Sequence, residues 1–318
     1  MMPVLGGAVN GAYRAGMTAE RRRANLLLMA AAVIWGLAFV AQRVGMRHLA
    51  PLTFNSARFV LGALVLLPLL PRSGRRPTGV PVAGRRETAL AALATGLVLF
   101  ASATLQQYGL VSTTAGKAGF ITSLYVVLVP VLGLIIGQRV GRWAWAGVAL
   151  ATAGLYLLSA RGAFSLAPGD GLVLLCAIGW AVHVQLVGLY VRRVPALRLA
   201  FGQFVVAAAL SLAGALGFEA PDPAGLRAAA APVLYAGIFS IGVAFTLQVA
   251  GQRHARPTDA AIILSGESVF AALGGALLLG ERLDARELAG CAAILGGVVV
   301  AQRGPAAADA ASPPPAAG

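Results

Sequence analysis

Ionisable side chains inside long apolar segments are the first candidates for chemistry in this sequence. Glu267 is the only acidic residue deep within such a segment, roughly 12 Å from its nearer end at about 1.5 Å per residue. A charge in that position is costly, so a group retained there is a functional candidate. Burial also favours the neutral form of a carboxyl group. Glu267 is suited to bind an amine or to carry a coupling proton; the alternative is a structural acid held by hydrogen bonds.

Two tryptophans and a histidine also lie far inside apolar segments. Trp35 and Trp180 sit roughly 14–15 Å from the ends of their segments, although tryptophan prefers membrane interfaces. Phe39 and Gln42 follow Trp35 at four and seven residues and share its helix face. Such a face suits an apolar or cationic ligand, and plain helix packing is the alternative. His183 lies one turn after Trp180, where it either relays protons or is a satisfied interior group.

Polar residues in other segments complete the candidate set. Asn55 and Arg58 share one face, and Arg58 either binds an anion or extends to lipid headgroups. Gln106 and Gln248 are expected to bond between helices and to line a cavity, together with Tyr125. The predicted substrate-binding residues are Trp35, Phe39, Gln42, Asn55, Arg58, Gln106, Tyr125, Trp180, Gln248 and Glu267, and the predicted coupling residues are Glu267 and His183.

The sequence carries no motif for a metal, a nucleotide or a nucleic acid. Cys176 and Cys291 lie in separate apolar segments without a CxxC partner. Neither a GxGxxG nor a Walker motif is present. The net charge of +14 comes from arginine clusters between apolar segments and not from one basic face. We therefore predict no metal, no cofactor, no nucleic-acid partner and no enzymatic activity.

Transmembrane helices must position these residues, because the chain is too apolar for a soluble domain. Of its 318 residues, 58% are hydrophobic and 11% are charged, whereas soluble domains carry about 25% charged residues. About 20 apolar residues cross a bilayer. We predict an all-α integral membrane protein with ten spans, joined by short connections: residues 25–44, 52–70, 88–111, 115–137, 143–160, 171–191, 198–217, 231–251, 259–279 and 287–302.

Basic residues predict the orientation of these spans. Seventeen arginines fall in the N-terminal segment, the C-terminal segment and the connections on their side, against seven basic residues, including Lys117, on the other side. The positive-inside rule then places both termini in the cytoplasm of a multi-pass inner-membrane protein in contact with lipid. Residues 1–24 form a cytoplasmic segment, and the Pro/Ala-rich residues 303–318 form a disordered cytoplasmic tail. Lys117 is expected to anchor the start of its span at the membrane surface.

The sequence repeats itself once, so that residues 25–160 and 171–302 hold five predicted helices each. An odd number of helices gives the two halves opposite orientations, which is the inverted-topology repeat of alternating-access transporters. The matches are Trp35 with Trp180 and Arg58-Phe59 with Gln203-Phe204 at an offset of 145, Thr104-Leu105-Gln106 with Thr246-Leu247-Gln248 at 142, and Gly137, Arg139, Gly147 and Gly154 with Gly280, Arg282, Gly290 and Gly297 at 143.

Several of these segments resemble the EamA-type transporters of the drug/metabolite transporter superfamily. The resemblance covers about residues 25–302, and the motifs that carry it are Trp35-Gly36, Ala57-Arg58-Phe59, Thr104-Leu105-Gln106, the run Thr113–Gly133 and the run Leu264–Leu283. It implies a ten-helix bundle of two inverted repeats that exports, or less often takes up, metabolites such as amino acids. The second half departs from the first at Gln203 and Ala181, where the first has Arg58 and Gly36.

These observations predict a secondary transporter that exports small metabolites (amino acids or related compounds) or drugs by alternating access, with or without proton coupling. An uptake carrier or exchanger of the same fold is the main alternative. A non-transporting sensor has no need of an inverted repeat, and a lipid-modifying enzyme lacks a polar catalytic cluster. Small residues on the fifth and tenth helices, such as Gly147 and Gly297, permit close packing within one chain or in a homodimer.

Overall fold

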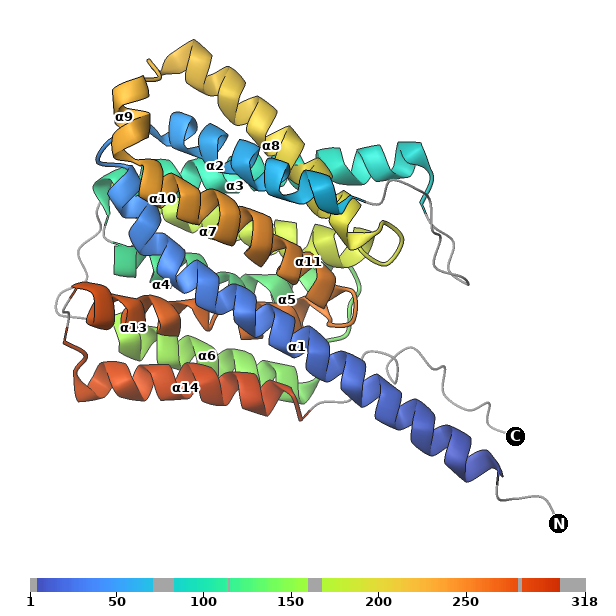
Figure 1. The fold of residues 1–318 in the computed structure, drawn as a ribbon. Helices are drawn as coiled ribbons and strands as arrows, with labels where there is room; N and C mark the ends of the chain where they lie inside the picture. Colours follow the sequence, from blue (N-terminus) through green and yellow to red (C-terminus); the bar gives the residue numbers. More distant parts are fainter. Residues whose placement is uncertain (1–4, 71–82, 114, 160–167, 280–281, 304–318) are drawn as a thin grey trace.

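The computed structural model describes residues 5–70, 83–113, 115–159, 168–279 and 282–303, and every regular element in these ranges is helical (Figure 1). The first half contains α1 (Leu5–Gly45), α2 (Pro51–Leu66), the short 3₁₀ helix η1 (Leu67–Leu69), α3 (Arg85–Ser112), α4 (Ala115–Ser123), α5 (Tyr125–Ile135) and α6 (Arg142–Ser159). The second half contains α7 (Pro168–Tyr190), α8 (Ala196–Phe218), α9 (Pro223–Ala228), α10 (Ala230–Leu234), the π-helical segment η2 (Tyr235–Phe245), α11 (Thr246–Gln252), α12 (Pro257–Leu264), α13 (Glu267–Leu279) and α14 (Ala285–Ala301).

Eight stretches of the described helices are long and apolar enough to cross a membrane. They are Ala19–Gly45, Pro51–Leu69, Arg85–Ser112, Lys117–Ile135, Pro168–Tyr190, Ala196–Phe218, Ala230–Gln252 and Pro257–Leu277. They coincide with eight of the ten predicted spans, which supports a multi-pass helical membrane fold. The other two predicted spans, 143–160 and 287–302, coincide with α6 and α14, and their crossing of the membrane stays a prediction. The predicted tail beyond residue 303 lies outside the described residues.

Four predicted spans are not single regular helices, and one of them, 52–70, passes from α2 into the 3₁₀ helix η1. The span 115–137 is divided at Leu124, and the span 259–279 is divided at Ser265 and Gly266. The Ser265 hydroxyl donates to the carbonyl oxygen of Ile262 at 2.8 Å, and such back-bonding bends helices. The span 231–251 passes through the π-helical η2, which is rare in proteins and frequent at functional sites. The spacing of apolar residues does not reveal these changes of backbone geometry.

The last helices of the two halves, α6 and α14, pack against each other through glycines (Figure 1). A Cβ atom on Gly297 would lie 2.7 Å from the carbonyl oxygen of Gly147, and one on Gly154 would lie 2.6 Å from that of Gly290. Residue numbers rise along one helix as they fall along the other, so the two helices are antiparallel. The small residues of these helices therefore serve packing within the chain.

A cluster of polar contacts, here called the charged tie, joins the two halves near the start of α4 and α7. Lys117 Nζ lies 2.5 Å from Asp170 Oδ2, and the carboxyl group of Asp170 is 2% exposed. Thr113 Oγ1 donates to Asp170 Oδ1 at 2.7 Å, and Arg43 donates to the Thr113 carbonyl oxygen at 2.6 Å. Lys117 is thus an ion-pair partner of Asp170, which was not predicted, and its role as an anchor at the membrane surface stays a prediction. Its position in the sequence could not show the ion pair, because the partner lies on another helix.

Two apolar clusters flank the middle of the bundle. One joins α1, α5, α6, α7, α12 and α14, and the other joins α2, α3, α7, α8 and η2. Trp35 on α1 and Trp180 on α7 pack against both clusters. The two tryptophans therefore lie between the two clusters, and both line the cavity described next.

Candidate functional site

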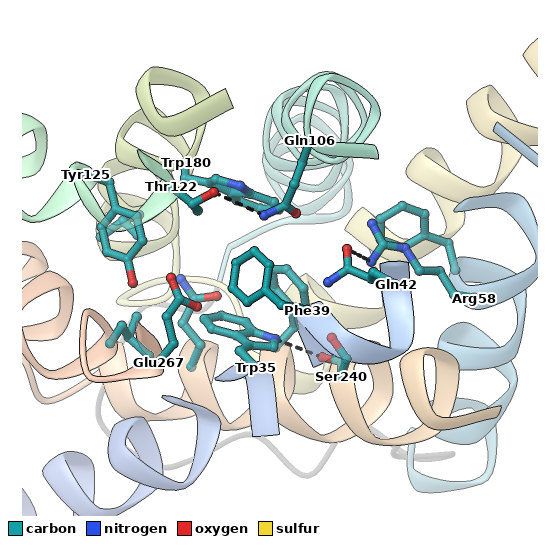
Figure 2. A pocket seen from close by; sticks show the side chains of 15 residues that line it. Trp35, Phe39, Gln42, Arg58, Gln106, Thr122, Tyr125, Trp180, Ser240 and Glu267 are labelled. Atoms are coloured by element: carbon teal, nitrogen blue, oxygen red, sulfur yellow. Dashed lines mark hydrogen bonds between the residues drawn. The ribbon is translucent and has the colours of Figure 1, made fainter. Parts of the chain in front are cut away.

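One cavity lies between the two halves, among helices α1 to α5, α7, η2 and α11 to α13 (Figure 2). The space that water centres can occupy in it is about 50 Å³, which is enough for a few waters. Aromatic and amide side chains dominate its wall, and one arginine and one glutamate face it. The lining residues are Trp35, Phe39, Gln42, Arg58, Phe59, Gln106, Thr122, Tyr125, Trp180, Val184, Ser240, Phe245, Gln248, Leu264 and Glu267.

The structure brings nine of the ten predicted substrate-binding residues together around this cavity. The exception is Asn55, which is fully buried on α2, and neither atom of its amide group has a hydrogen-bond partner in the described part of the chain. His183 is also absent from the lining. Its Nε2 lies 2.8 Å from Gln203 Oε1, and its ring stands edge-on to Trp180 at 5.8 Å between centroids. Proton relay by His183 stays a prediction, because the residue lies outside the wall.

Arg58 forms the basic part of the wall. It is 3% exposed, and one guanidinium nitrogen donates to Gln42 Oε1 at 2.9 Å. The guanidinium also lies over the rings of Phe54 and Phe59, at 5.6 and 5.1 Å from their centroids, in cation–π geometry. Gln42 is held in turn by a bond from its Nε2 to the carbonyl oxygen of Ala38 at 3.2 Å. Arg58 therefore points into the bundle and does not extend to the headgroups.

Glu267 forms the acidic part of the wall, at the first residue of α13 directly after a helix break. Its carboxyl group accepts a bond from Ser123 Oγ at 3.4 Å, and Ser123 Oγ lies 2.6 Å from Ser268 Oγ. The Tyr125 hydroxyl is close enough to interact with this carboxyl group (Figure 2), although it does not reach hydrogen-bond geometry. Both breaks meet here, because Ser123 ends α4 and Tyr125 begins α5.

Aromatic rings fill the space between these polar groups. Trp35 donates from Nε1 to the carbonyl oxygen of Ser240 at 3.1 Å, and its ring lies 4.6 Å from that of Phe245. Trp180 lies 5.8 Å from the same Phe245 ring. Phe39 lies near Trp35 in the close view (Figure 2) and packs close to Gly119 of α4. This wall offers flat apolar surface to a ligand, with few polar groups to fix its orientation.

The two predicted glutamines occupy different environments. Gln106 donates from Nε2 to Thr122 Oγ1 at 3.3 Å, which joins α3 to α4 as expected for an interhelical bond. Gln248 donates to Gln252 Oε1 at 3.0 Å, within one helix, and its own Oε1 has no partner among the described residues. Gln252 in turn donates a hydrogen bond from Nε2 to the carbonyl oxygen of Val184 on α7 at 2.9 Å. Gln248 thus keeps a free acceptor beside the cavity.

Several wall residues were not singled out as site residues by the sequence analysis. Phe59 and Thr122 fell within motifs, and Phe245 directly precedes the matched Thr246-Leu247-Gln248 motif. Ser240 contributes a main-chain oxygen to Trp35, which no side-chain pattern predicts. Ser123 and Ser268 were missed because their role depends on where the helix breaks meet. A search for polar residues flanking the matched break positions would have found both serines.

Long apolar helices around a cavity lined by both halves define a multi-pass membrane protein of the transporter class. The chain belongs to the EamA-like transporter family, because the sequence model of that family matches residues 22–160 and again residues 167–302. This result confirms the predicted resemblance and fits the drug/metabolite transporter superfamily. A membrane transporter of this type, rather than an enzyme, is the function that the family indicates.

Known relatives align with most of this chain. An uncharacterized transporter of Archaeoglobus fulgidus is 32% identical over 286 residues, which are 88% of this chain and 86% of that protein. The uncharacterized inner membrane transporter YedA of Escherichia coli K12 is 26% identical over 286 residues, 87% of this chain and 90% of that protein. A solved crystal structure has a TM-score of 0.70 at 22% identity, covering 88% of this chain and 96% of its own. At that identity the likeness shows the fold alone.

Proposed function

We propose that the protein is a secondary transporter that exports small metabolites, such as amino acids or related compounds, or drugs across the inner membrane by alternating access. The observation that carries this proposal is the cavity whose wall contains residues of both halves of the chain. In such a transporter the ligand binds between two repeats, whose rearrangement opens the site to one side and then to the other. Uptake or exchange by the same fold is the alternative, and the flux experiment below separates a proton-coupled carrier from an exchanger.

Alternating access requires that the halves be inverted repeats with ten crossings in all. The family description matches the chain in two separate ranges. The contacts between α6 and α14 support inversion. Gly147 contacts Gly297, and the residues matched to these two in the other half are Gly290 and Gly154. Gly290 and Gly154 are also in contact. A contact pair that maps onto itself is expected at a two-fold pseudo-symmetry axis between antiparallel helices. We take α6 and α14 as the fifth and tenth spans.

The excess of arginines supports a cytoplasmic location for both termini. The charged tie then lies at the outer end of the bundle, because α1 leads from the cytoplasmic end to Arg43 near the opposite end. The relative YedA is named an inner membrane transporter, which supports an inner membrane location for this chain. Substrate would enter from the cytoplasmic end and leave past the charged tie.

Glu267 is the proposed coupling group. It is 4% exposed, it faces the cavity, and its neighbours are hydroxyl groups that can bond to either form of a carboxyl group. Proton release from Glu267 to one side and proton uptake from the other would link substrate export to the proton gradient. The chain supplies no nucleotide-binding motif that would drive transport otherwise.

Flux in proteoliposomes tests the proposal. The purified protein is reconstituted with a pH-sensitive dye inside the vesicles and exposed to a panel of amino acids and cationic drugs. We expect proton movement that depends on one class of compound, is lost in Glu267→Gln, and is retained in Glu87→Gln, a half-exposed acid paired with Arg193. Substrate movement without protons would refute coupling and favour an exchanger. No compound-dependent movement in any vesicle would contradict transport of this panel.

A further inference from the structure

Arg58 carries a positive charge that no carboxyl group within ion-pair distance balances, in the part of the chain that the structure describes. Its contacts are the amide of Gln42 and the faces of Phe54 and Phe59, and its Nε is buried without a partner. Arginine keeps its charge in proteins, and a buried charge without a counter-ion is costly. Because Arg58 also faces the cavity, an anionic group of a ligand is the natural partner.

Glu267 presents the opposite case. Its near neighbours are the hydroxyl groups of Ser123 and Tyr125, and no basic side chain forms an ion pair with it among the described residues. When ionised, its negative charge is buried, faces the same cavity and lacks a counter-ion. A cationic group of a ligand would supply one. When no ligand is bound, a proton can take that place.

The two charged groups do not neutralise each other, because α1 holds them apart. Gly36 lies against the main-chain oxygen of Glu267, which a Cβ atom on Gly36 would approach to 2.6 Å. Gln42, further along the same helix, accepts a hydrogen bond from Arg58. Gly36 and Gln42 are six residues apart, which is about 9 Å along a helix at about 1.5 Å per residue. Figure 2 shows the two charged side chains at opposite ends of the group, with Phe39 and Trp35 between them.

We infer that Arg58 and Glu267 are the charge-selecting ends of one site, so that the protein accepts zwitterions and discriminates against ligands with a single charge. The inference rests on the proposed function, which leaves amino acids and cationic drugs as equal candidates. A cation alone leaves Arg58 unbalanced, and an anion alone leaves Glu267 unbalanced or requires its protonation. Only a molecule with both charges balances both groups, and its apolar part then lies against the aromatic wall.

The cavity also bears on the size of the zwitterion. The space that water centres can occupy in it is about 50 Å³, which favours a compact zwitterion. A long zwitterion would have to displace the wall.

Matched probes test charge selection on the unmodified protein. Binding to the purified protein in detergent is measured by calorimetry for phenylalanine, phenethylamine and phenylpropanoate, and again for leucine, isopentylamine and isocaproate. Within each set the apolar group is constant while one charge is removed. We expect the amine and the acid to bind at least about tenfold more weakly than the zwitterion in one set or both. The inference would be overturned if the amine bound as tightly as the zwitterion of the same set in both sets. It would also be overturned if neither zwitterion bound at millimolar concentration.

Two variants then assign each end of the site. Arg58→Gln introduces the residue that the second half carries at the matched position, Gln203. It should weaken zwitterion binding about tenfold and abolish the preference for the zwitterion over the amine. Glu267→Gln should abolish the preference over the acid instead. The exposed pair Arg193 and Glu87 supplies the controls Arg193→Gln and Glu87→Gln, which should keep both preferences.

The outcomes separate this inference from the proposed function, because binding in detergent does not require transport. Zwitterion-selective binding without flux in vesicles would refute transport and leave the selective site standing. Flux of a cationic drug with no preference for zwitterions would support transport and refute charge selection. Should Arg58→Gln fail to fold, as judged by size-exclusion chromatography, the comparison of probes on the unmodified chain and on Glu267→Gln still decides the matter.

Discussion

The two halves of the chain share a helical plan but bring different chemistry to the cavity. At the matched helix breaks, the first half has Leu124 where the second has Glu267. At the matched positions on α2 and α8, the first half has Arg58 facing the cavity, whereas Gln203 in the second is fully buried beside His183. Each half thus supplies one charge of opposite sign. The comparison teaches that matched positions of the two halves lie close to the same cavity, while single differences between the halves decide the charge that each presents there.

Making the halves alike at the helix breaks should have the largest effect. Glu267→Leu gives the second half the residue that the first carries and removes the acidic side chain that lines the cavity. We expect the initial rate of transport in proteoliposomes to fall by about 10- to 100-fold, the equivalent of a charged hydrogen bond. Leu124→Met is the control and should keep the rate. Adding Leu124→Glu to Glu267→Leu should not restore transport. The hydroxyl groups of Ser123 and Tyr125 surround the carboxyl group at position 267. The residues matched to these two, Gly266 and Ser268, would offer a glutamate at position 124 a different set of neighbours.

The charged tie is a second difference between the halves. Asn25 and Ala260 stand at the positions matched to Asp170 and Lys117, and Asn25 instead bonds Gln302 at 2.7 Å. Lys117→Gln leaves the buried carboxyl group of Asp170 without its cation. Breaking a buried pair costs about 3–5 kcal/mol, and because Lys117 is 26% exposed we expect roughly 2–3 kcal/mol.

Chemical unfolding in detergent micelles measures this loss. The control is Arg193→Gln, which breaks the exposed pair with Glu87 and should cost less than about 1 kcal/mol. Equal costs for the two variants would show that the tie contributes no more than a surface ion pair. A larger cost for Lys117→Gln would support the tie as a contact that holds the two halves together at one end.

The glycine contacts between α6 and α14 are where the halves agree, and they sharpen the comparison. Gly154 and Gly297 are matched residues, and each faces a main-chain oxygen of the partner helix. Gly154→Ala and Gly297→Ala should therefore destabilise the protein alike, by about 1–3 kcal/mol from overpacking. Gly296→Ala is the control, since only a side-chain atom of Leu150 lies near that position. Thermal unfolding of the three variants in detergent measures these losses of stability. Clearly different losses for Gly154→Ala and Gly297→Ala would contradict the pseudo-symmetry.

Much of this architecture follows from the sequence, because hydropathy and repetition act over many residues at once. The eight apolar stretches and the nine cavity residues were both predicted, the latter by combining depth in a span with matched positions such as Trp35 and Trp180. Contacts that depend on how helices rotate against each other were not. The pairing of Lys117 with Asp170 and the meeting of Ser123 with Ser268 belong to this group.

Backbone geometry limited the prediction further. The breaks at Leu124 and Ser265, and the π-helical η2, leave the apolar spacing of their spans intact. Asn55 was grouped with Arg58 because they share a helix face, yet of these two residues Arg58 lines the cavity and Asn55 is buried away from it. His183 shares a face with Trp180 but turns to Gln203 on α8. A one-dimensional pattern places residues on a face, and it does not say which neighbour that face meets.

The smallest expected effect concerns the two tryptophans, which are matched in sequence but not in bonding. The Trp35 indole donates to the Ser240 carbonyl oxygen, whereas the Trp180 indole donates to no main-chain carbonyl in the described structure. Trp35→Phe keeps an aromatic ring beside Phe245 and removes a bond worth about 1 kcal/mol. If the proposed zwitterion is the ligand, its apparent affinity should then weaken about fivefold. Trp180→Phe removes no such bond, so its affinity, measured in parallel by calorimetry, should change less than about twofold. A larger loss in Trp180→Phe would mean that its ring, and not the anchored ring of Trp35, carries the ligand contact.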